Sequence, residues 1–180
     1  MCSNRKTAQA EAILTGMLAR EMVFSNLFSA IDSEYDLVII DVSPSITQIQ
    51  TCAMVYTKSL LVPVAMDILS FQGAGASIET AKRLHQLLKM NIRTLAILPV
   101  MVHRRMVRTE LVLRGLEDLS AQQSIPLLPA IRTDTSVPKA ARSQKFLADY
   151  DKTGKAYNDY REACYALCSL LDGVANVEQT

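Results

Sequence analysis

Tryptophan is absent from the sequence, and only 6% of its 180 residues are aromatic. A chain this rich in aliphatic residues fits helices packed on a parallel sheet better than an aromatic-rich β-sandwich. The net charge of +1 excludes a strong general attraction to nucleic acid or membranes, so any basic site must be local. No apolar run reaches the roughly 18 residues of a membrane span, and no signal-peptide pattern begins the chain. We therefore expect a cytoplasmic protein without a membrane partner.

The four cysteines lack the spacing of a disulfide framework or a zinc ribbon. Cys164 and Cys168 lie one helical turn apart, and we expect two buried thiols there rather than metal ligands. Neither a histidine nor a second cysteine pair lies nearby. The pattern indicates reduced thiols and no structural metal.

Apolar segments of strand length and helix length alternate along the chain, which predicts βαβ units, a parallel sheet and helices on both of its faces. The expected strands are residues 37–40, 60–64, 95–100 and, as a short edge strand interrupted by prolines, 125–131. The expected helices are residues 7–31, 46–56, the stretch after Gly75 up to residue 88, 107–119 and 156–171, with a short helix near Pro138. We expect one α/β domain over residues 1–180. Because no strand precedes the first helix, the sheet is expected to be incomplete on its N-terminal side.

The segment YDLVIIDVSPS, residues 35–45, places the carboxylate of Asp41 at the end of a short apolar run. Ligands of parallel α/β sheets lie outside such strand ends. One interpretation is a carboxylate that caps the next turn or helix. A second is a phosphoacceptor aspartate, but the acidic pair that would hold its Mg²⁺ has no counterpart at an upstream strand end. A third is a Walker B carboxylate that holds Mg²⁺ on nucleotide phosphates.

Four blocks of the sequence resemble the ParA family of deviant Walker ATPases, which are relatives of MinD. The blocks are YDLVIIDVSPS, LLVPVAMD, ILPVMVHRRM and IRTDTSVPKAARSQKFLADYD, and the resemblance extends from about residue 3 to residue 171. Matching positions are Tyr35, Asp36, Asp41, Pro44 and Ser45, then Pro63 and Gly73, then Met101 and Arg105, and finally Ile131, Ala140, Lys145, Tyr150 and Asp151. Asp67 stands where the family has a glutamate. The order and spacing of the blocks make the resemblance specific.

The resemblance implies a three-layer, P-loop-NTPase-like fold, with ATP or ADP and Mg²⁺ as cofactors. By this resemblance Asp41 holds Mg²⁺ through water, and Ser43, Pro44, Ser45 and Asp67 belong to the switch segments. Nucleotide contacts are implied for Val100, Met101, Arg132, Thr133 and Asp134. Non-specific DNA contacts are implied for Arg105, Arg108, Lys139, Arg142 and Lys145. The family further implies a homodimer, a ParB-like partner protein and association with the nucleoid.

The chain departs from the family by lacking the G-x-x-x-x-G-K-[ST] phosphate loop, and no glycine cluster precedes Gly73. Phosphate binding needs converging backbone amides and a lysine. We therefore expect no catalytic residue within this chain and no ATPase activity from the chain alone, whether it is part of a longer ATPase or a shortened relative. Ser43, Val100 and Arg132 also replace family residues.

Three functions remain open at this stage. The leading interpretation is a partition protein that segregates plasmids or chromosomes as an ATP-dependent, DNA-binding dimer. A ParA-derived interaction module without catalysis is an alternative from a different class. A MinD-like positioning ATPase would need a basic amphipathic helix at the end of the chain, and LCSLLDGVANVEQT contains no lysine or arginine.

Overall fold

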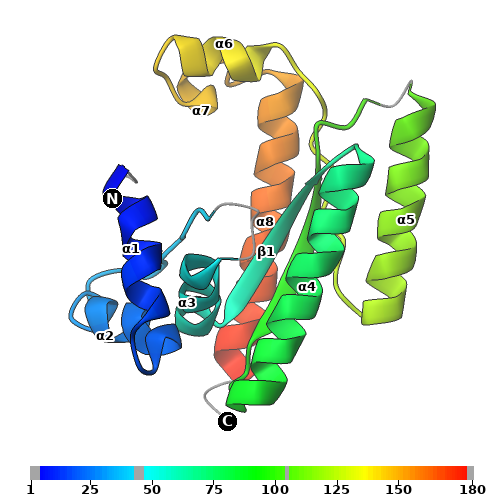
Figure 1. Cartoon of the computed structure of the whole chain (residues 1–180). Helices are drawn as coiled ribbons and strands as arrows, with labels where there is room; N and C mark the ends of the chain where they lie inside the picture. The colour runs from blue at the N-terminus through cyan, green and yellow to red at the C-terminus, as the bar shows by residue number, and fades with distance from the viewer. Residues whose placement is uncertain (1–4, 43–46, 104–105, 178–180) are drawn as a thin grey trace. The chain divides into compact units, whose positions relative to one another are not determined.

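The computed structural model describes residues 5–42, 47–103 and 106–177 (Figure 1). The chain divides into two compact units, the first comprising Met1–Leu60 and Ser77–Arg93, the second Leu61–Ala76 and Thr94–Thr180. The division passes through the long helix α4 (Ile68–Leu88). The single domain that the sequence predicts over residues 1–180 stays a prediction.

The first unit is helical and packs around α3 (Gln48–Thr57). Thr47 caps α3, because its side chain accepts a hydrogen bond from the backbone N–H of Gln50 at 3.2 Å. The buried side chains of Met54 and Val55 pack with Ala81 of α4 and with Ile92. The predicted helix over 46–56 is confirmed by α3.

The predicted helix over residues 7–31 is wrong as one continuous element. The structure has α1 (Arg5–Thr15), a 3₁₀ turn η1 (Arg20–Met22) and α2 (Val23–Phe28) in its place. Gly16 weakens the helix by about 1 kcal/mol relative to alanine, and Ala19 adopts a left-handed φ of 50°. The Arg20 guanidinium donates to the free Thr15 carbonyl at 3.2 Å, which stabilises the helix end. The apolar periodicity continues across this break and therefore did not reveal it.

The predicted strand at 37–40 is also wrong, because this segment has no regular secondary structure. Leu37 is 56% exposed and Ile39 is 82% exposed. A strand forms only when neighbouring strands satisfy its backbone amides and carbonyls. Among the described residues no strand pairs with this segment.

The second unit contains the sheet, in which β1 (Ser59–Ala65) lies beside β2 (Arg93–Val100) in parallel. These strands confirm the predictions for 60–64 and 95–100. Residues 125–132 run along the other edge of β2 through two isolated parallel bridges. The Leu128 N–H donates to the Ile97 carbonyl at 2.9 Å, and the Ile131 N–H donates to the Pro99 carbonyl at 2.9 Å. The predicted edge strand at 125–131 is therefore present only as isolated bridges rather than as a continuous strand, because Pro126 and Pro129 have no N–H to donate.

Four helices complete the second unit: α5 (Val107–Gln123), α6 (Ser136–Arg142), α7 (Leu147–Tyr150) and α8 (Lys155–Val177). They confirm the helices predicted at 107–119 and 156–171 and the short helix near Pro138. The helix expected after Gly75 instead begins at Ile68. Cys164 and Cys168 are exposed, so the prediction of buried thiols is wrong. None of the helices in the described part of the chain has the length and apolarity to cross a membrane.

Candidate functional site

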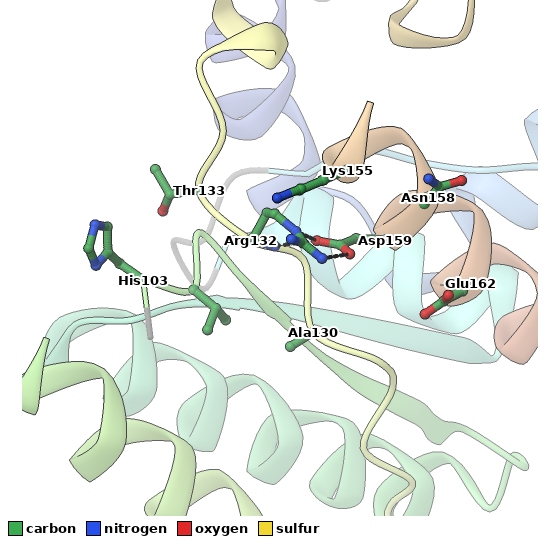
Figure 2. Close-up of a pocket in the computed structure, with 9 residues that line it drawn as sticks. His103, Ala130, Arg132, Thr133, Lys155, Asn158, Asp159 and Glu162 are labelled. Atoms are coloured by element: carbon green, nitrogen blue, oxygen red, sulfur yellow. Dashed lines mark hydrogen bonds and ion pairs between the residues drawn. The ribbon is translucent and has the colours of Figure 1, made fainter. Parts of the chain in front are cut away.

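A hollow of about 630 Å³ lies in the second unit, just beyond the carboxyl end of β2. Three segments form its walls: the loop after β2, the segment that runs along the β2 edge, and the first two turns of α8 (Figure 2). The residues that line it are Val102, His103, Ala130, Arg132, Thr133, Lys155, Asn158, Asp159 and Glu162. The carboxyl edge of a parallel sheet is the usual ligand position in this fold class. Two of the predicted nucleotide contacts, Arg132 and Thr133, therefore lie in a real hollow.

An ion pair between Arg132 and Asp159 organises one wall of the hollow. The Arg132 Nε lies 2.5 Å from Asp159 Oδ2, and a terminal guanidinium nitrogen lies 2.7 Å from Oδ1. The Arg132 backbone N–H also donates to Oδ2 at 3.0 Å. Figure 2 shows the two side chains facing each other. Asp159 is only 8% exposed, and its hydrogen bonds raise the pKa of Arg132. This bidentate pair fixes the plane of the guanidinium.

The remaining lining residues supply both apolar and polar surface. Val102 is buried and Ala130 lies across from the helix. Lys155, Asn158 and Glu162 recur at helical spacing, so they share one face of α8. The Thr133 backbone N–H donates to the Val102 carbonyl at 3.0 Å, which holds the loop against the edge segment. The lining therefore combines two apolar side chains with an amide, a hydroxyl and charged groups.

The other predicted nucleotide contacts do not line this hollow. Val100 ends β2, and Met101 follows with a left-handed φ of 55° and an exposed side chain. Asp134 accepts a hydrogen bond from the Ser136 backbone N–H at 2.8 Å. That hydrogen bond holds the pKa of the Asp134 carboxyl below its usual value. Asp134 thus orders the start of α6.

Asp67, predicted as a switch residue, occupies the carboxyl end of β1 and caps α4. Its Oδ1 accepts from the Ser70 backbone N–H at 2.8 Å, and its Oδ2 accepts from the Ser70 hydroxyl at 2.7 Å. These hydrogen bonds, the backbone one first, lower the pKa of Asp67, and the charge of Arg108 lowers it further. Asp67 thus acts as the cap of α4, whereas the capping interpretation of Asp41 stays a prediction.

The predicted magnesium ligand Asp41 belongs to the first unit and is exposed. The switch residues Ser43, Pro44 and Ser45 lie outside the described residues. Within the part of the chain that is described, no three His, Cys, Asp or Glu side chains cluster in a way that could hold a metal ion. A single carboxylate suits Mg²⁺ only when phosphates and water complete its shell. The described residues therefore do not form a magnesium site or a phosphate cradle.

The predicted DNA contacts lie in the second unit. Arg108 is on the first turn of α5, Lys139 and Arg142 are on α6, and Lys145 follows α6. All four side chains are exposed. Arg105 lies outside the described residues. Sequence reasoning missed Asp159, because a single acid within a helix carries no distinguishing signal.

Residues 1–94 match a family model described as an AAA domain. The cell division protein PomZ of Myxococcus xanthus is 27% identical over 179 residues, which are 99% of this chain and 55% of PomZ. An ATP complex of a McdA variant from Cyanothece matches with a TM-score of 0.81 at 16% identity, covering 94% of this chain and 64% of that one.

Cobyrinic acid a,c-diamide synthase from Mycobacterium smegmatis, with bound ADP and magnesium, matches with a TM-score of 0.63 at 22% identity. That match covers 79% of this chain and 62% of the synthase chain. The structural matches confirm the predicted incomplete, P-loop-NTPase-like α/β fold. The chain spans between about half and two thirds of the length of these proteins.

Proposed function

The chain belongs to the AAA domain family, with the ParA/MinD-type P-loop ATPases, and from this premise we propose that it contributes the base-binding part of a nucleotide-dependent partition switch. The hollow beyond β2 would receive the base of ATP or ADP. The whole protein would act as a positioning or partition ATPase, whereas this chain alone would not hydrolyse ATP.

The single observation that supports this proposal is the position of Arg132 and Thr133. Family resemblance assigns these two residues to the nucleotide, and both line a hollow at the carboxyl edge of the sheet. A volume of about 630 Å³ lies within the range of small-molecule sites, which is roughly 300 to 1,000 Å³.

Each lining residue would have a simple role toward the base. Val102 and Ala130 would contact its face, and the Asn158 amide and Thr133 hydroxyl would hydrogen-bond its edge. Asp159 would hold the Arg132 guanidinium in a fixed plane beside it. Asp41 would hold Mg²⁺, which when bound neutralises phosphate charge. The amides and lysine of a phosphate loop are not in this sequence, so hydrolysis would depend on residues outside it.

The finer assignments follow the same proposal. Arg105, Arg108, Lys139, Arg142 and Lys145 would contact DNA phosphates once nucleotide brings two subunits together. Such contacts are independent of sequence and weaken steeply with salt. A ParB-like protein would be the partner, and the nucleoid the location.

A non-catalytic interaction module remains the second candidate, supported by Ser43, Val100 and Arg132, which replace family residues. Under that proposal the Arg132–Asp159 pair would be structural, and the hollow would bind no nucleotide.

Equilibrium titration with a fluorescent ATP analogue distinguishes the two. We expect weak, saturable binding by the purified chain, and about tenfold weaker binding by Asn158→Leu, which replaces the hydrogen-bonding amide with an apolar side chain of similar size. Lys89→Ala, an exposed change in the first unit, should bind like the unaltered chain. Binding that Asn158→Leu leaves unchanged, or the absence of binding, would overturn the proposal.

A further inference from the structure

A second hollow, of about 520 Å³, lies among α6, α7 and the first half of α8. We refer to it as the apolar groove, because alanine, valine, leucine, aromatic and cysteine side chains form most of its lining. It shares no lining residue with the hollow beyond β2. All of its residues belong to the second unit.

The floor and one wall of the groove come from a single face of α8. Tyr157, Tyr160, Arg161 and Cys164 line it, at spacings of three, four and seven residues that put them on one side of a helix. This face extends over about two helical turns, or roughly 10 Å.

The opposite wall comes from the reversal between α6 and α7. Gln144 adopts a left-handed φ of 53°, and the Lys145 N–H donates to the Ala140 carbonyl at 3.1 Å. This tight reversal places Phe146 beside the groove with 81% of its surface exposed. An exposed aromatic side chain at the edge of a concave apolar surface is typical of a docking site.

The charged residues that line the groove are all cationic. Lys145 and Arg161 are the charged residues among those that line it, and no carboxylate is among them. The Arg161 guanidinium lies 5.9 Å from the centre of the Tyr157 ring, a cation–π contact that positions it on the wall. Within residues 5–42, 47–103 and 106–177, neither cation forms an ion pair. The groove therefore presents two cations around an apolar floor.

We propose that the apolar groove binds an acidic amphipathic helix of a partner protein. Apolar side chains of that helix would fill the groove, and its Asp or Glu side chains would pair with Lys145 and Arg161. Duplex DNA, which Lys145 would also contact under the proposed function, would leave the apolar walls uncovered, so a helix bound in the groove would compete with DNA for Lys145. A lipid bilayer is flat and would not fill the concave floor of the groove. An amphipathic helix complements both the shape and the charge.

Fluorescence polarisation with a designed probe tests this proposal on the whole chain. The probe is a labelled helical peptide of about five turns, with Leu or Phe at the i, i+3, i+4 and i+7 positions and Glu on both flanks. A peptide of the same composition in scrambled order is the reference. We expect saturable binding of the probe and at least about tenfold weaker binding of the scrambled peptide.

Two charge reversals and one truncation locate the binding surface. Arg161→Glu, Lys145→Glu and Phe146→Ala should each weaken probe binding several-fold. Lys89→Glu makes the same charge change at an exposed site in the first unit and should leave binding unchanged. Circular dichroism melting confirms that each variant is folded, as expected for exposed positions.

Several results would overturn the proposal. Equal binding of the probe and the scrambled peptide would do so. A loss of probe binding with Lys89→Glu as large as that with Arg161→Glu would also overturn it. Tighter binding of duplex DNA or of anionic vesicles than of the probe, with the same sensitivity to Arg161→Glu and Phe146→Ala, would assign the groove to that other partner. A groove-dependent dimer of the chain that excludes the probe would assign it to a second copy.

Discussion

Asp159 holds the Arg132 side chain on the wall of the hollow beyond β2. Its two carboxylate oxygens receive the Arg132 guanidinium and the Arg132 backbone N–H. Because it is almost fully buried, losing its charge would leave the guanidinium without its fixed partner.

We predict that Asp159→Asn lowers the melting temperature and weakens binding of the fluorescent ATP analogue several-fold. The amide cannot accept the guanidinium in the same bidentate way. Glu162→Gln changes a neighbouring exposed carboxylate on the same face of α8 and should have little effect on melting. Equal melting temperatures for Asp159→Asn and the unaltered chain would contradict this assignment.

The cap formed by Asp67 predicts a pH dependence. Hydrogen bonds from Ser70 lower the pKa of the folded Asp67 carboxyl below its usual value, so the stabilisation is fully present above the pKa of the unfolded chain, about 3.9. It is lost as the pH falls through the lower, folded pKa. We predict that Asp67→Asn reduces the loss of stability on acidification below about pH 4.

Urea midpoints measured between neutral pH and about pH 2 check this prediction. Asp118→Asn, on the exposed side of α5, serves as the matched change. The prediction fails if the midpoint of Asp67→Asn falls as steeply with acid as that of the unaltered chain.

At the residue scale, two of the nucleotide contacts that the sequence predicts line one hollow, and their role toward a nucleotide stays a prediction. Arg132 and Thr133 follow an apolar segment in a block with a family counterpart, and they do line the hollow. Asp159 could not be found, since its role comes from a contact across 27 residues. Asp41, Ser43, Pro44, Ser45 and Arg105 stay predictions, because the last four lie outside the described residues and Asp41 has no described ligand partner.

At the scale of elements, β2 is the central strand of the second unit. It pairs with β1 on one side and with residues 125–132 on the other. Its Ile97 side chain is fully buried, so removing methyl groups there leaves a cavity that the neighbours cannot fill.

We predict that Ile97→Ala lowers the free energy of unfolding by about 2–5 kcal/mol, and Ile97→Val by about 0.5–1.5 kcal/mol. Leu111→Ala on α5 removes a side chain that is largely exposed and should change it by less than about 0.5 kcal/mol. Urea denaturation measures all three. If Ile97→Ala lowered the free energy of unfolding no more than Leu111→Ala, β2 would not be part of the hydrophobic core.

Strands and helices could be predicted from the sequence where the described chain also contains the segments that they pack against. The strands at 60–64 and 95–100 pair with each other, and helices at 107–119 and 156–171 have apolar faces to bury. Residues 37–40 have the composition of a strand but no described strand beside them. The apolar period of residues 7–31 is unbroken, whereas α1 ends at Thr15 and Ala19 takes a left-handed backbone conformation, which periodicity does not register.

For the whole molecule, the chain corresponds to part of a ParA/MinD-type ATPase fold. It covers 55% of PomZ and 64% of the McdA chain. Fold class could be predicted from the order and spacing of four sequence blocks, since these follow the order of strands and loops. Function at the level of cargo, partner and nucleotide turnover could not, because the phosphate loop is not in this sequence.

The proposed DNA contact makes a prediction for a protein that unites this chain with a phosphate loop. Changing both Arg105 and Arg108 to alanine should remove its nucleotide-dependent retention on DNA and reduce the salt dependence of what remains. Binding of the fluorescent ATP analogue should persist. The pair Arg83→Ala and Arg114→Ala, two exposed arginines that already pair with Glu79 and Glu110, provides the control. Unaltered DNA retention in the Arg105 and Arg108 variant would reject the basic-loop assignment.

The most direct measurement is an amide NMR titration of the ¹⁵N-labelled chain with ATP. The proposal predicts that shifted resonances gather at Val102, His103, Arg132, Thr133 and Asn158, that adenosine shifts the same amides, and that no phosphate is released. Shifts confined to other parts of the chain, or ATP turnover by the chain alone, would contradict the claim that it supplies a base-binding site without the catalytic phosphate loop.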